Sequence, residues 1–476
     1  MQTHPRSLPR RTFAARLTAP LAALAAALLA AGCALPPAAT GTAGPARASA
    51  TLPATAEAAP TPTDCPRVLP AGSRCLSGQD SAGAYYLIAI PPDWKGTLVM
   101  HSHGGPTLGP PRLSRTVEDL ERWAVTVKAG YAWAGSSFRQ GGVAVRAAAE
   151  DTERLRRIFV QHVAKPDFTI LHGQSWGASV AATGASMFTD DGAGRRPYDA
   201  VLLTSGVLAG GTRAYDMRLD LRVIYQVLCG NHPRPDEAQY PLWMGLPAHS
   251  ALKPADLAAR ANACLGLDKP AAARTPEQQQ KARTIADTLK IPESSILSHL
   301  NWATWHFQDI AQHRTGGRNP FGNIGAVYRG SSDDAALNRA VLRYRADPEA
   351  VRVFGADTDP DGRIPVPVLT VHGIGDPTAF VEMDDSFRRT MERAGTADRL
   401  VQTFTRDNGH SYLTEPAYPT LFAVLTDWAR GGRKPTPADV AARCPSFEAR
   451  FGTGCHFVPD YRPQPLETRV APRERP

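Results

Sequence analysis

The chain has 476 residues, of which 43% are hydrophobic and 7% aromatic, and a formal net charge of +8. This length is sufficient for two compact parts, and the composition is that of an ordinary globular protein rather than a repeat array. Part of the positive charge comes from a leader without acidic residues, and no dense stripe of Lys and Arg interleaved with aromatic residues follows it. We therefore expect no nucleic-acid partner.

Residues 1–32 have the pattern of an export signal peptide. An arginine-rich start precedes an apolar stretch that is too short to span a bilayer and contains Pro20. Ala30-Ala31-Gly32 before Cys33 resembles a bacterial lipoprotein processing box, which implies a lipid-modified Cys33 and a membrane anchor on the periplasmic or cell-surface side. The usual leucine three positions before the cysteine is replaced by Ala30, so ordinary cleavage to a soluble periplasmic or secreted protein stays an alternative.

Residues 33–63 differ in composition from the rest of the chain. They are mostly Ala, Pro, Thr and Gly with almost no large apolar residue. Such a segment cannot bury enough apolar surface to offset the entropy lost on ordering. We interpret it as a flexible tether.

Six cysteines follow Cys33, and an even number in an exported protein indicates disulfides. Short closed loops lose the least entropy, which favours pairing between neighbours along the chain. Buried free thiols are the alternative, and the absence of a C-x-x-C pair argues against structural zinc. The expected pairs are Cys65 with Cys75, Cys229 with Cys264, and Cys444 with Cys455.

Short apolar runs alternate with amphipathic segments through much of the chain. This alternation predicts an α/β fold with a mostly parallel, doubly wound sheet. It is interrupted over residues 207–352, where helical patches and aromatic residues indicate a large inserted lid. The core is therefore expected at 64–206 and 353–435, followed by a disulfide-containing extension at 436–476. Strands are predicted at 98–100, 131–135, 168–171, 200–204, 366–371 and 400–405, with helical spacing at 117–127 and 155–163.

The most informative motif is the pentapeptide Gly173-Gln174-Ser175-Trp176-Gly177, which follows a predicted strand and precedes a run of small residues. The two glycines allow a sharp turn from strand to helix, in which the serine backbone is strained and its hydroxyl is exposed above the sheet. Ser175 is the predicted nucleophile.

A serine hydroxyl needs a base within hydrogen-bond reach and a third group that orients the base. Asp376 and His410 each follow a late predicted strand, at the same carboxyl edge of the sheet as Ser175. We expect Asp376 rather than its competitors, which sit in a Pro/Gly-rich loop and are interpreted as solvated turn residues: Asp357, Asp359 and Asp361. His372 is expected to be a packed or supporting histidine.

Two further histidines, His101 and His103, lie at the end of the first predicted strand. Without an accompanying carboxylate cluster, we expect them to support a loop rather than to bind a metal. No metal or other cofactor is predicted.

Four motifs occur in the order typical of one family: His103-Gly104-Gly105, the serine pentapeptide, the His-Gly-Ile-Gly-Asp run ending at Asp376, and Asn-Gly-His at His410. Together they resemble the α/β-hydrolase superfamily, whose triad runs Ser, Asp or Glu, then His. The resemblance covers about residues 97–413. It implies an oxyanion hole made by the backbone N–H of Trp176 and another in the Gly104-Gly105 turn.

The expected function is an exported serine hydrolase that cleaves carboxylic esters, with a small-molecule substrate. Aromatic residues of the lid, among them Trp302 and Trp305, suggest an apolar or aromatic ester. An exocellular aminopeptidase is one alternative, because its acidic lid residues could come from Asp333, Asp334 and Glu349. Acyl transfer and a non-catalytic surface lipoprotein are the others.

Overall fold

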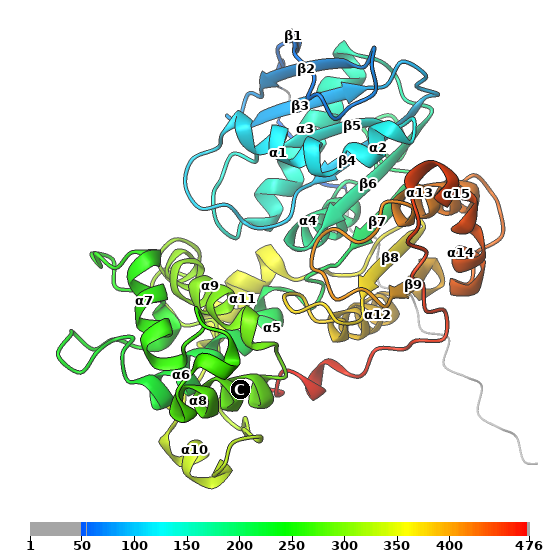
Figure 1. Ribbon diagram of the computed structural model, residues 1–476. Helices are drawn as coiled ribbons and strands as arrows, with labels where there is room; N and C mark the ends of the chain where they lie inside the picture. The colour runs from blue at the N-terminus through cyan, green and yellow to red at the C-terminus, as the bar shows by residue number, and fades with distance from the viewer. Residues whose placement is uncertain (1–48, 54, 474–476) are drawn as a thin grey trace, which may run out of the picture. The chain divides into compact units, whose positions relative to one another are not determined.

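The computed structural model describes residues 49–53 and 55–473 (Figure 1). The predicted signal peptide and Cys33 lie outside these residues. Within the described ranges, none of the helices combines the length and the apolar character needed to cross a membrane.

One sheet organises the chain. Its strands are β1 (Thr61–Thr63), β2 (Arg74–Gln79), β3 (Tyr85–Ile90), β4 (Thr97–Ser102), β5 (Ala132–Ser136), β6 (Phe168–Gln174), β7 (Ala200–Thr204), β8 (Val368–Gly373) and β9 (Leu400–Thr405). They are ordered β1-β2-β3-β5-β4-β6-β7-β8-β9. The first three neighbouring pairs in this order, up to β3 with β5, are antiparallel. Every pair from β5 with β4 onward is parallel. The predicted α/β class with a mostly parallel sheet is confirmed.

Alternate residues of the parallel strands face two separate apolar clusters, as the pleat requires. In β4, Leu98 and Met100 belong to one cluster and Val99 to the other. Helices therefore cover both faces of the sheet (Figure 1). The first cluster includes α3 (Val145–His162), α4 (Trp176–Met187) and α12 (Glu382–Ala394), and the second includes α1 (Leu113–Arg122), α2 (Ala124–Lys128) and α13 (Ala417–Ala429).

The chain between β7 and β8, residues 205–367, is here called the inserted segment. It is mainly helical, and its helix α11 continues beyond the predicted lid boundary at residue 352. The disulfide between Cys229 and Cys264 joins α6 to α7. The helices are α5 (Gly211–Ala214), α6 (Asp216–Cys229), α7 (Pro254–Leu265), α8 (Pro276–Leu289), α9 (Ile296–Asp309), α10 (Asp334–Ala340) and α11 (Pro348–Thr358).

The C-terminal residues contact the inserted segment. Cys444 and Cys455 join the short helices α14 (Pro437–Arg443) and α15 (Pro445–Phe451) to the chain that follows them. Further along, Val470 is buried and its carbonyl accepts a hydrogen bond from Arg213. The end of the chain therefore helps to fix the inserted segment.

The last part of the predicted tether, at 50–53 and 55–63, contacts the core, so the prediction of a flexible segment is wrong there. The Ala50 N–H donates to the Met187 carbonyl at 2.7 Å, and Glu57 accepts two hydrogen bonds from Ser81. Residues 61–63 form β1, which pairs with β2. Backbone pairing with the core orders this segment although its side chains bury little apolar surface.

Two other differences from the sequence prediction have local causes. The antiparallel strands β1, β2 and β3 at one side of the sheet are absent from the sequence prediction, because no helix lies between them to produce an alternating pattern. The helical spacing over 117–127 corresponds to two helices, because Trp123 leaves the helical conformation between α1 and α2.

Candidate functional site

Ser175 occupies a strained turn between β6 and α4. Its φ of 56° and ψ of −121° lie where residues other than glycine are rare. A Cβ on Gly173 would come within 2.1 Å of the Gly177 carbonyl oxygen, and one on Gly177 within 2.1 Å of the Ser102 carbonyl oxygen. Glycine is therefore required on both sides, and the turn directs the Ser175 side chain into a cavity at the carboxyl edge of the sheet.

Two other predicted residues reach Ser175 from the loops after β8 and β9. The Ser175 hydroxyl lies 2.8 Å from His410 Nε2, and His410 Nδ1 lies 2.8 Å from Asp376 Oδ2. These distances fit a serine that donates to the imidazole and an imidazole that donates to the carboxylate. The structure thus brings the three predicted residues into one hydrogen-bonded series.

The Asp376 carboxylate is held from its other side as well. Its Oδ1 accepts hydrogen bonds from the backbone N–H groups of Thr378 and Ala379, at 2.8 and 3.0 Å. Burial raises the pKa of Asp376, but hydrogen bonds from His372 and His410 outweigh it and lower the pKa to about 2. Asp376 is therefore ionised at neutral pH and can orient His410.

His372 lies between two buried carboxylates. Its Nδ1 is 2.6 Å from Asp384 Oδ2, and its Nε2 is 2.8 Å from the Ala379 carbonyl and 3.3 Å from Asp376 Oδ2. Burial lowers the pKa of His372, but the charge of Asp384 and the hydrogen bonds to both carboxylates raise it to about 10. His372 is thus a buried cation that supports Asp376, as expected of a packed or supporting histidine, and its pairing with Asp384 is an addition from the structure.

The residues expected to form the oxyanion hole line the same cavity. Trp176 is the first residue of α4, so its N–H has no carbonyl partner within the helix. Gly105 has a φ of 72°, and a Cβ on Gly104 would overlap the Gln174 side chain at 1.9 Å. The positive φ favours glycine at position 105, and a side chain at position 104 would have to displace the Gln174 amide, in a turn that lies beside the nucleophile.

The cavity around Ser175 has a volume of about 400 Å³. Trp302 of α9 lines it, whereas Trp305 does not. Three cationic residues that the sequence did not single out also line it: Arg115, Arg122 and Arg218. No Asp or Glu is among its lining residues, although Arg115 pairs with Glu118 and Asp119 outside the lining.

Acidic residues proposed for an amine site lie elsewhere. Asp333 is the N-cap of α10, Asp334 is in its first turn, and Glu349 is in the first turn of α11, where it pairs with Arg352. None of them lines the cavity at Ser175. They stabilise helix starts instead.

The description of Asp357 and Asp359 as solvated turn residues is wrong. Asp357 lies in α11 and accepts a hydrogen bond from the Arg146 N–H, while Asp359 accepts from both the N–H and the hydroxyl of Thr212. Both carboxylates bind segments distant in sequence, which a local turn pattern cannot reveal. Of the three aspartates, only Asp361 is exposed, and its carboxylate accepts a local hydrogen bond from the backbone N–H of Arg363.

The two early histidines are buried in the fold. His101 Nδ1 lies 3.0 Å from His172 Nδ1, and the His103 ring stacks on Phe138 at a centroid distance of 4.4 Å. Burial lowers the pKa of His103 to about 3, so it is neutral. Among residues 49–53 and 55–473, no three His, Cys, Asp or Glu side chains are grouped closely enough to hold a metal ion.

The six cysteines after Cys33 form three disulfides. Cys65 pairs with Cys75, Cys229 with Cys264, and Cys444 with Cys455. These are the neighbours in sequence that loop-closure entropy favours.

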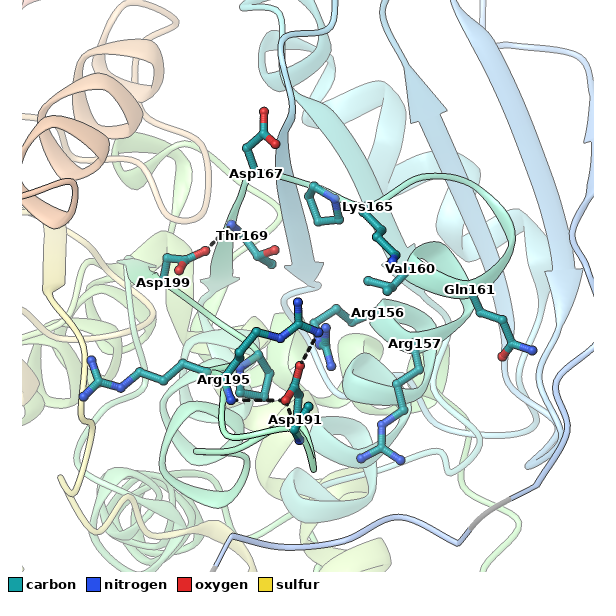
Figure 2. A pocket seen from close by; sticks show the side chains of 14 residues that line it. Arg156, Arg157, Val160, Gln161, Lys165, Asp167, Thr169, Asp191, Arg195 and Asp199 are labelled. Atoms are coloured by element: carbon teal, nitrogen blue, oxygen red, sulfur yellow. Dashed lines mark hydrogen bonds and ion pairs between the residues drawn. The ribbon is translucent and has the colours of Figure 1, made fainter.

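A second cavity lies at the opposite edge of the sheet, where β6 and β7 begin. It has a volume of about 660 Å³ and is lined by five cationic residues together with Asp167, Asp191 and Asp199. Figure 2 shows the Arg195 side chain directed toward Asp191. This groove contains none of the residues around Ser175. Its cationic residues are Arg156, Arg157, Lys165, Arg195 and Arg196.

The strand order, the strained serine after β6, the aspartate after β8 and the histidine after β9 define the α/β-hydrolase fold. No family model and no curated protein matches the sequence.

Solved structures to which the chain is similar include hydrolases at low identity. One is a puromycin hydrolase, at 13% identity and a TM-score of 0.35, where the match covers 79% of this chain but only 40% of that chain. Another is feruloyl esterase B from Aspergillus oryzae, at 12% identity and a TM-score of 0.41, covering 76% of this chain and 81% of the other. A variant of the rice cell wall degrading esterase LipA from Xanthomonas oryzae has 13% identity and a TM-score of 0.35, with 71% and 82% covered.

Proposed function

We propose that this chain is an exported serine hydrolase that cleaves carboxylic esters through an acyl-enzyme on Ser175. The observation that carries the proposal is the hydrogen-bonded series from the Ser175 hydroxyl through His410 to Asp376, with 2.8 Å at each step. A nucleophile, a base and an orienting carboxylate at these distances are what acyl transfer requires. The three disulfides fit an exported protein.

In the first half of the reaction, Ser175 Oγ attacks the ester carbonyl carbon while His410 Nε2 takes the hydroxyl proton. Asp376 accepts the hydrogen bond from Nδ1–H and stabilises the imidazolium that forms. The Trp176 N–H and a second donor in the Gly104-Gly105 turn hold the negative oxygen of the tetrahedral intermediate. His410 then gives its proton to the departing alcohol, which leaves an acyl group on Ser175.

In the second half, water attacks the acyl carbon, and His410 accepts the proton from that water. Collapse of the second tetrahedral intermediate releases the acid and returns the proton to Ser175 Oγ. Another nucleophile in place of water would give acyl transfer. Lipid anchoring through Cys33 would keep this activity at a membrane surface.

An aminopeptidase of the same fold is the main rival. A substrate ammonium would need a carboxylate near the site, and the cavity at Ser175 has arginines where such a group would be required. Its lining therefore supports an ester without a positive charge over an amino-acyl substrate.

The test is hydrolysis of nitrophenyl esters of increasing acyl length beside amino-acyl nitroanilides, with Ser175→Ala as control. We expect ester turnover that falls by about 10⁴-fold or more in the variant, as in other serine hydrolases that lose the nucleophile. Preference for the anilides would replace the esterase proposal by a peptidase. Full activity in a folded Ser175→Ala preparation would remove the mechanism altogether.

A further inference from the structure

Arg218, on α6, is a buried cation without an anionic partner in the cavity at Ser175. Its residue exposure is 4%, and it lines the cavity wall. In the described part of the chain, its guanidinium makes no hydrogen bond or ion pair, and its buried Nε has no partner. Its contacts are aromatic: the guanidinium carbon lies 4.4 Å from the ring centroid of Trp302 and 5.4 Å from that of Tyr215.

One helical turn further on, Arg222 shows how this fold accommodates a structural arginine. Its guanidinium is also buried, but it donates to three backbone carbonyls and to the Thr304 hydroxyl. A buried charge is costly unless hydrogen bonds or an opposite charge compensate it. Arg222 meets this requirement through its two terminal nitrogens, although its Nε also has no partner, whereas Arg218 meets it only in part, through the two aromatic faces.

The surroundings of Arg218 contain little that could neutralise it. The cavity has no acidic lining residue, and Arg122 adds positive charge to its wall, whereas Arg115 pairs with Glu118 and Asp119 outside the lining. Burial lowers the pKa of His299 to about 3 and of His306 to about 4, so both neighbouring histidines are neutral. Burial lowers the pKa of Arg218 to about 10, which leaves it charged at neutral pH.

We propose that Arg218 binds a carboxylate of the substrate, so that the preferred substrates are esters carrying a carboxylate on the acyl or the alcohol half. This inference rests on the proposed ester hydrolysis at Ser175, because both residues line one cavity. The stacking against Trp302 holds the guanidinium plane, and a planar fork of N–H donors matches a carboxylate in two parallel hydrogen bonds. A substrate ammonium would be repelled at the same place.

The experiment uses two pairs of substrates that differ only in the charged group. For the acyl half, the mono-4-nitrophenyl ester of adipic acid is compared with 4-nitrophenyl hexanoate. For the alcohol half, 4-acetoxybenzoate is compared with its methyl ester. In the wild-type protein we expect the carboxylate to raise kcat/KM by about 10- to 100-fold in one pair, the range of a charge-assisted hydrogen-bonded pair. That pair identifies which half carries the group.

Arg218→Met should reduce this ratio to about one, and Arg218→Lys should retain part of it because the charge remains without the fork. Arg122→Met is the matched control, since it removes an exposed cation of the same cavity and should keep the larger part of the ratio. Loss of the ratio in Arg122→Met but not in Arg218→Met would overturn the assignment. A ratio of one or less in the wild type for both pairs would overturn it too.

Two readouts separate this proposal from a structural role and from the proposed function. The first readout uses only the wild type: 4-hydroxybenzoate should inhibit hydrolysis of 4-nitrophenyl hexanoate at least about 10-fold more strongly than methyl 4-hydroxybenzoate does. If Arg218→Met fails to fold and this difference is absent, Arg218 is structural and the proposal falls. Hexanoate turnover that depends on Ser175, without any preference for carboxylates, would leave the esterase function in place and remove only the anion site. No turnover of any ester would remove both.

Discussion

The cavity at Ser175 and the groove at the opposite edge of the sheet both carry several cations, but they differ in how these charges are compensated. In the groove, Arg195 pairs with Asp191 (Figure 2). Arg156 and Arg157 pair with Glu153, and Lys165 and Arg196 are exposed to solvent. In the cavity, Arg115 likewise pairs with Glu118 and Asp119, but Arg218 is buried and has no acceptor in the described chain. The binding role proposed for Arg218 therefore rests on its burial without an anionic partner, and not on its charge alone.

The same contrast applies to negative charge. The carboxylates of the groove lie in or near turns at the surface, whereas Asp376 and Asp384 are buried and share His372. Fixed charges in a site that excludes water interact more strongly than exposed ones. We therefore expect substitutions at the carboxyl edge to have large effects and those in the groove to have small ones.

The largest effect is expected for Asp376→Asn. The amide keeps the size of the side chain but cannot hold the His410 tautomer that accepts the Ser175 proton, and about a 10⁴-fold loss in kcat is expected. Steady-state kinetics with a nitrophenyl ester measures it. Asp361→Asn is the control, because this exposed carboxylate accepts only a local hydrogen bond. A loss of less than tenfold in Asp376→Asn would show that another group orients His410.

The next effect separates the two buried arginines of α6. Arg222→Met leaves several buried acceptors without donors, each at a cost of about 1–3 kcal/mol, so we expect the free energy of unfolding to fall by about 3 kcal/mol or more. Arg218→Met removes an uncompensated charge and should cause no comparable loss. Urea denaturation of both variants tests the contrast. Equal destabilisation would mean that Arg218, too, is retained for stability.

A smaller effect concerns the pH dependence of stability. The folded pKa of His372, about 10, lies above its ordinary value of 6.5, so its contribution is fully present below pH 6.5 and is lost as the pH rises toward 10. Asp384→Asn removes the main cause of that shift. The difference in unfolding free energy between wild type and variant should therefore be largest near pH 6 and shrink toward pH 9.5. A constant difference across this range would contradict a charged His372.

The sequence was sufficient for the parallel strands and the three residues around Ser175 because each has a local pattern: a buried strand, a tight turn and one polar residue at the strand end. It was insufficient for Arg218. The run Asp216 to Arg222 alternates acidic, basic and apolar residues, as an exposed helix also can. These charges are buried by tertiary packing, in which α8 and α9 contact α6. Asp359 was misjudged for the same reason, since its partner Thr212 lies 147 positions away.

The smallest effect is expected in the groove. Arg195 has a side-chain exposure of 74%, and its pairing with Asp191 is screened by solvent. Arg195→Ala should therefore change the free energy of unfolding by less than about 1 kcal/mol and leave kcat/KM for both members of each ester pair unaltered. The same kinetic assay used for Arg218 measures this. A substantial change in the carboxylate preference would mean that long-range charge, rather than a buried partner for the substrate, governs selectivity, because Arg195 lies at the opposite edge of the sheet.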